Sequence, residues 1–64
     1  MAEQWTADIV AKLHLYGITR RELADELGVT AQYVTMVLNG KKKAAAGIED
    51  RMAKAITDIV DRRI

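Results

Sequence analysis

The chain lacks cysteine, proline, phenylalanine and serine, and it contains a single histidine. Without cysteine there is no disulfide framework and no cysteine-based metal cluster, and without serine or cysteine the commonest catalytic nucleophiles are missing. No long apolar run is present, which argues against a membrane-spanning helix, and no signal peptide is recognisable. These absences predict a protein that is not an enzyme and that holds no metal, no cofactor and no evident small-molecule ligand.

The chain has 64 residues, of which 50% are apolar and 30% are charged. This length and composition predict one small globular domain over residues 1–64. The formal net charge is only +1, but the charged residues are distributed unevenly along the chain. In the middle of the chain, basic residues stand at the two edges of an uncharged stretch from Gly28 to Gly40, and they are Arg20, Arg21, Lys41, Lys42 and Lys43. This placement of charge is the first indication of function.

Apolar residues recur at spacings of three and four, which predicts an all-α fold with four helices and no strands. The first helix has one apolar face, formed by Trp5, Ile9, Leu13 and Tyr16. Gly17 is expected to end this helix in the left-handed conformation. Its start is open between a point near Ala2 and a cap at Thr6, where the flanking residues would form a hydrophobic staple. Trp5 and the single histidine, His14, are expected to be structural.

The second and third helices are separated by a very short connection. Thr19 and Glu22 have the spacing of a capping box at the start of the second helix, and Gly28 is expected to end it. Thr30 follows two residues later and is a suitable cap for the third helix. The connection is too short for an antiparallel pair, so a steeply crossed two-helix unit is predicted over about residues 20–39.

The third helix is expected to end at Asn39-Gly40, and the lysine- and alanine-rich link 41–46 that follows is expected to stay helical in part. The last helix is predicted over about residues 48–63. One of its arcs is apolar and belongs in the core, with Ile48, Met52, Ala55, Ile56 and Ile59. A second apolar stripe fits either a deeper core or a dimer interface, and it comprises Ala53, Val60 and Ile64.

The third helix has two faces of different character. Helical geometry places Val34, Val37 and Leu38 on the buried face, and the opposite face carries Gln32, Met36 and Asn39 with Thr35 alongside. An exposed helix face without any charged residue is unusual in water, so another molecule is expected to cover it. The major groove of B-DNA is about 12 Å wide and admits one helix, while cations at the flanks can meet the phosphates.

Several of these residues together resemble the helix-turn-helix of the lambda repressor and Cro family, namely Leu23-Ala24, Leu27-Gly28-Val29, Val34 and Val37. The resemblance implies a compact four-helix, lambda repressor-like fold that binds operator DNA as a homodimer and regulates transcription, often as a repressor. Such proteins are frequent in phages and mobile elements, which implies a bacterial or phage-encoded protein of the cytoplasm, associated with the nucleoid when bound to DNA. The matching base-contacting positions are Thr30, Ala31, Gln32, Thr35 and Met36.

The resemblance also implies contacts to the sugar-phosphate backbone from Arg20, Asn39 and Lys41. The placement of charge adds Lys42 and Lys43 to the predicted phosphate contacts. For Tyr33, at the side of the third helix, core packing and a hydroxyl contact to phosphate are equally open.

No arginine or lysine occupies a groove-facing position, so a bidentate cation on guanine, the commonest specific contact, is excluded. Gln32 suits adenine, and Ala31 and Met36 suit thymine methyl groups, which predicts a half-site rich in A·T pairs. The alternative function is a protein-interaction module, similar to an antirepressor or an antitoxin, on the same helical fold. Salt-dependent binding to a DNA duplex distinguishes the two.

Overall fold

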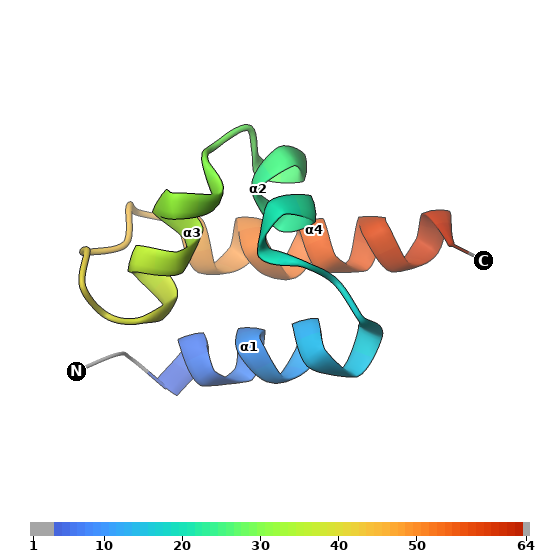
Figure 1. Ribbon diagram of the computed structural model, residues 1–64, viewed down its shortest axis with the longest axis horizontal. Helices are drawn as coiled ribbons and strands as arrows, with labels where there is room; N and C mark the ends of the chain where they lie inside the picture. Colours follow the sequence, from blue (N-terminus) through green and yellow to red (C-terminus); the bar gives the residue numbers. More distant parts are fainter. Residues whose placement is uncertain (1–3, 64) are drawn as a thin grey trace.

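The structure is a computed structural model that describes residues 4–63, and within this range the chain forms helices and no strand. The four helices (Figure 1) are α1 (Gln4–Tyr16), α2 (Arg20–Leu27), α3 (Ala31–Leu38) and α4 (Ile48–Arg62). The predicted all-α, four-helix fold is therefore confirmed. None of the described helices has the length and apolar character that crossing a bilayer requires.

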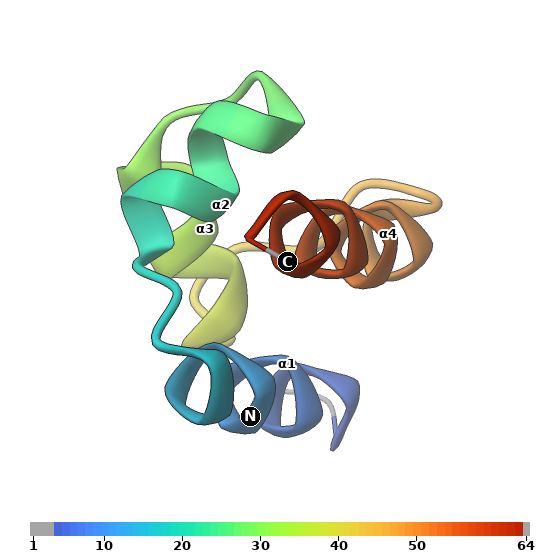
Figure 2. The ribbon, with the colours of Figure 1, turned by 90° about the vertical axis from the view of Figure 1, so that its right-hand side faces the viewer.

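Helices α1 and α4 run side by side in the same direction, and α2 and α3 pack across them on one side of the molecule (Figures 1 and 2). The C-terminal end of α4 is joined to α1 by a hydrogen bond and to α2 by an ion pair. Arg63, which caps α4, donates from Nη1 to the carbonyl oxygen of Tyr16 at 2.6 Å, and its Nη2 lies 3.0 Å from Oε2 of Glu22. A single residue after α4 therefore contacts the end of α1 and the first turn of α2.

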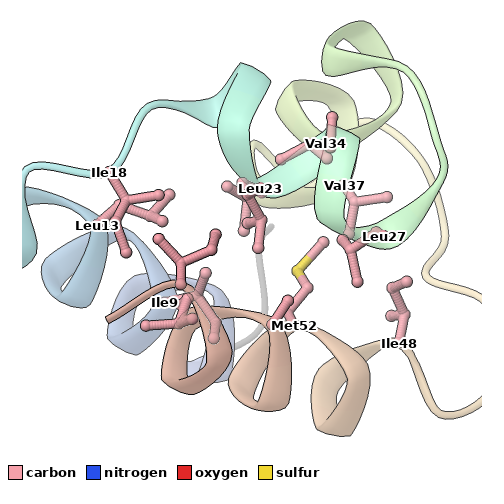
Figure 3. Packing of buried hydrophobic residues seen from close by; sticks show 14 residues of the cluster. Ile9, Leu13, Ile18, Leu23, Leu27, Val34, Val37, Ile48 and Met52 are labelled. Atoms are coloured by element: carbon pink, nitrogen blue, oxygen red, sulfur yellow. The ribbon is translucent and has the colours of Figure 1, made fainter. Parts of the chain in front are cut away.

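The core draws on all four helices (Figure 3), and its least exposed large side chains are Leu23, Val34 and Met52. The apolar arc predicted for the last helix is confirmed, since all five of its members are buried. The predicted face of α1 is confirmed at Ile9 and Leu13 but is wrong at Tyr16, which remains 44% exposed. Tyr16 lies in the last turn of α1, where its side chain lines a hollow between α1 and α4.

The start of α1 differs from one of the two expectations. A helix that begins at Thr6 is wrong, because Gln4 and Trp5 are already helical. Thr6 is only 3% exposed, so it occupies a core-facing position inside the helix rather than a cap. The other expected start, near Ala2, lies outside the described residues, as does Ile64.

Helix α2 begins and ends with the predicted capping pattern. The Glu22 amide donates to Oγ1 of Thr19 at 3.0 Å, and the Thr19 amide donates to Oε1 of Glu22 at 3.4 Å, which completes the capping box. Gly28 ends α2 with a φ of 75°, a left-handed conformation that costs other residues more than glycine. The next amide, that of Val29, then donates back to the carbonyl of Ala24 at 3.0 Å.

The link between α3 and α4 is not helical, so the expectation that part of it remains helical is wrong. Its path is set at the end of α3, where Gly40 has a positive φ and the chain turns away from the helix axis.

The last helix ends at Arg62, one residue earlier than expected, and Arg63 is its C-cap. Glu49 and Asp50 in the first turn and Arg62 in the last turn complement the helix dipole.

Candidate nucleic-acid interface

Helix α3 is fixed on its inner side by the core and at its start by a threonine cap. Val34, Val37 and Leu38 are at most 4% exposed, which confirms the predicted buried face. The Tyr33 amide donates to Oγ1 of Thr30 at 3.1 Å, as the sequence predicts. The orientation of α3, and therefore of its outer face, is determined by these contacts.

The outer face of α3 carries no charged side chain. Gln32 and Asn39 are exposed, whereas Thr35 and Met36 are half-buried and thus less accessible than periodicity alone suggests. Thr30 is exposed just before the helix, and Ala31 is half-buried and packs against the core. The predicted base-contacting residues therefore gather on and beside one helix face, and the exposed Gln32 supplies the only amide side chain within α3 itself.

Residues Lys41 to Lys43, here called the lysine segment, follow directly after the end of α3 and are anchored there through backbone hydrogen bonds. The amides of Lys41 and Lys42 both donate to the carbonyl oxygen of Met36, at 2.9 and 3.2 Å, and the Gly40 amide donates to Val37 O at 3.1 Å. Only a residue that tolerates a positive φ permits this reversal, and Gly40 has a φ of 76°. The three lysines therefore leave α3 in a defined direction, and all three are exposed.

Tyr33 lies at the side of α3 and contacts both the core and the lysine segment. Its side chain is half-buried and packs against the core cluster. The ammonium of Lys42 lies 5.2 Å from the centroid of its ring, within the range of a cation–π interaction. Both Lys42 and Lys43 line a hollow of about 200 Å³ with Trp5, at the start of α1.

Arg20, the other predicted phosphate contact, is exposed at the first position of α2. It lines a hollow with His14, Ile18 and other residues between the end of α1 and the start of α2. Figure 1 shows the yellow lysine segment at the left end of the molecule, whereas α2 starts nearer the middle. Cationic side chains are thus present both at the start of α2 and after α3.

Two of the three acidic residues of α2 pair with arginines at the C-terminal end of α4, which compensates their charges within the molecule. Glu26 forms an ion pair with Arg62, and Glu22 forms one with Arg63. The exposed cations of the region from Thr19 to Lys43 consequently act against less acidic charge than the sequence of this segment suggests. This compensation was not predicted from the sequence, because the partners are 36 and 41 residues apart and no local pattern links them.

The contact between Tyr33 and Lys42 was not predicted from the sequence either. These residues lie on either side of a helix end, so helical periodicity does not relate them. Only the chain reversal at Gly40 brings Lys42 back over the ring. A useful signal would have been Lys42, two residues after the glycine of the Asn39-Gly40 helix stop, combined with an aromatic residue about two turns before that glycine.

The second apolar stripe on α4 is only partly in the core. Ala53 and Val60 are half-buried, and Val60 packs against the core cluster. Both also line a hollow of about 170 Å³ between α1 and α4, together with Lys12 and Asp61. Its third member, Ile64, lies outside the described residues. Within residues 4–63, no group of three or more acidic or imidazole side chains is arranged to hold a metal ion.

Residues 11–56, more than half of the chain, match the family model described as Helix-turn-helix, which represents the lambda repressor-like type. The match spans α2, the connection at Gly28 and α3, which are the elements that carry the candidate interface. No curated protein and no solved structure gives a significant match.

Proposed function

Because the chain belongs to the lambda repressor-like helix-turn-helix family of DNA-binding regulators, we propose that it is a sequence-specific transcriptional repressor of bacterial or phage origin. In this proposal α3 enters the major groove of operator DNA. The single observation that carries the proposal is the uncharged outer face of α3, followed directly by three exposed lysines. Short neutral side chains can approach base edges, while the lysines remain near the phosphates.

The proposed base contacts come from Thr30, Ala31, Gln32, Thr35 and Met36. The Gln32 amide can donate to N7 and accept from N6 of adenine, and the methionine side chain suits a thymine methyl group. No cation is available on this face for a bidentate contact to guanine. We therefore propose an operator half-site rich in A·T pairs at the positions that α3 reads.

The proposed phosphate contacts come from the two flanks of α3, with Arg20 on one side and Asn39, Lys41, Lys42 and Lys43 on the other. These side chains are exposed, and the lysine segment is held against Met36 by its backbone amides. Each phosphate contact releases condensed counterions, so affinity falls as salt rises. Contacts of this kind orient the protein and contribute no direct sequence discrimination.

We further propose that the operator is bound by a homodimer, because a single reading helix makes few base contacts. The candidate contact surface is the hollow between α1 and α4 that Ala53 and Val60 line. Lys12 and Asp61 lie at the same hollow, and a twofold arrangement can pair the lysine of each copy with the aspartate of the other. Sedimentation across a concentration series, with and without DNA, tests this step, and a monomer under both conditions contradicts it.

Selection from random duplexes at a fixed, stated salt concentration tests the proposed function. The expected result is an enriched sequence with two A·T-rich half-sites separated by about 34 Å, one turn of B-DNA. Half-sites dominated by G·C pairs at the positions read contradict the proposed use of Gln32 and Met36. If no duplex is bound even at low salt concentration, the protein acts through another protein instead.

A further inference from the structure

Tyr33 and Lys42 form a contact that joins α3, the proposed reading helix, to the lysine segment. The ammonium of Lys42 lies 5.2 Å from the centroid of the Tyr33 ring. The ring itself is held in place, because it is half-buried against the core cluster and its own amide donates to Thr30 at 3.1 Å. Lys42 therefore meets a ring whose position is set by the fold.

The main chain of Lys42 is also fixed. Its amide donates to the carbonyl oxygen of Met36 at 3.2 Å, which anchors the residue to the end of α3. Lys41 shares this anchor at 2.9 Å, but among the described residues its ammonium lies over no ring. Lys42 thus has both its backbone and its charged group in defined positions, and Lys41 has only its backbone so defined.

We infer that Tyr33, although it lies on the reading helix, is a positioning residue that orients Lys42 toward a phosphate and does not itself read a base. This inference rests on the proposed DNA-binding function. An ammonium has three N–H donors, so it can face the ring and still donate to a phosphate oxygen. A lysine that already occupies its bound conformation loses less side-chain freedom on binding, and this raises affinity.

A positioning role for Tyr33 can be distinguished experimentally from a base contact and from a hydroxyl contact to phosphate. If Tyr33 acts through Lys42, its loss weakens binding to every duplex by the same factor. A base contact would instead weaken binding to the selected duplex alone. A hydroxyl contact to phosphate would be lost with the hydroxyl, whereas the ring of phenylalanine keeps the attraction for a cation.

The test is a double-mutant cycle with Tyr33→Leu and Lys42→Ala, with Kd measured by fluorescence anisotropy on the selected duplex and on a scrambled duplex at one salt concentration. Tyr33→Leu is expected to weaken binding to both duplexes by about two- to tenfold, the cost of immobilising one lysine side chain that the ring no longer orients. In the Lys42→Ala background the same change is expected to have no further effect. Tyr33→Phe is expected to bind nearly as the unmodified protein does.

Lys41→Ala is the matched control, because Lys41 has the same backbone anchor without the ring. Its effect is expected to add to that of Tyr33→Leu, since residues without a shared contact contribute independently. Additivity between Tyr33→Leu and Lys42→Ala overturns the inference. So does a loss with Tyr33→Phe as large as that with Tyr33→Leu, or a loss confined to the selected duplex.

A measurement on the free protein keeps the inference distinct from the proposed function. The ε-methylene protons of Lys42 are expected to show an upfield ring-current shift in the NMR spectrum, and Tyr33→Leu is expected to abolish it. Absence of this shift in the unmodified protein overturns the positioning role even if DNA is bound. If the shift is present but no duplex is bound, the proposed function fails and the phosphate-positioning role fails with it.

Discussion

At the scale of single residues, side chains on α3 and just beyond its end differ in what they can recognise in DNA. Gln32 is an exposed amide on the outer face of α3, whereas Lys41 is an exposed cation anchored just beyond its end. An amide discriminates among bases by donor and acceptor pattern, but a cation interacts with any phosphate. Substitutions at these two positions should therefore change different properties of binding.

We expect Gln32→Ala to relax the preference at one base pair of each half-site by about 1–3 kcal/mol and to leave binding to scrambled DNA unchanged. Competition with duplexes that differ at single positions measures this effect. Lys41→Ala is the comparison, because it should weaken all sequences equally and reduce the slope of log K against log salt by about 0.9. A uniform loss with Gln32→Ala would show that this side chain reads no base.

At the scale of the helices, the capping and stop residues in the sequence were the best predictors of where the helices begin and end. The capping box of Thr19 and Glu22, the cap at Thr30 and the stop at Gly28 are local patterns, and each acts through hydrogen bonds to neighbouring backbone groups. The start of α1 was less predictable, because Thr6 is a good capping residue by type but faces the core in the folded chain. Burial of this kind depends on distant residues.

Thr30→Ala should lower the free energy of unfolding by about 1 kcal/mol, because it leaves the Tyr33 amide without its cap. Thr57→Ala is a matched control. The Thr57 hydroxyl donates to the carbonyl of Ala53 within α4 at 3.1 Å and is exposed, so its removal should change stability little. Urea unfolding followed by circular dichroism measures both, and equal losses would contradict the role of Thr30 as a cap.

At the scale of the whole molecule, buried apolar contacts hold the four helices together and exposed arginines add links at the surface. Met52 of α4 is fully buried among residues of the other helices (Figure 3). Arg51 donates to the carbonyl oxygen of Leu27 at 2.9 Å, and Arg62 and Arg63 pair with glutamates of α2. Helical periodicity predicted the apolar contacts. It could not predict the arginine contacts, because long polar side chains reach partners far away in sequence.

Met52→Ala should destabilise the fold by about 2–5 kcal/mol, since it removes packed atoms and leaves a cavity. A chain of this length has a total stability of about 3–10 kcal/mol, so the variant is expected to lose a large share of it. Arg62→Ala should cost less than about 1 kcal/mol, because the ion pair that it removes is exposed to water. Thermal unfolding compares the two, and similar losses would contradict a core-dominated fold.

The central claim is that the outer face of α3 and the lysine segment after it lie against DNA. It is tested most directly by following backbone amide and side-chain NMR signals while a selected duplex is titrated into the protein. The largest changes are expected at Gln32, Met36 and residues 41–43, which carry the proposed DNA contacts. Binding that leaves Gln32 and Met36 unchanged, or changes confined to α1 and α4, would contradict it.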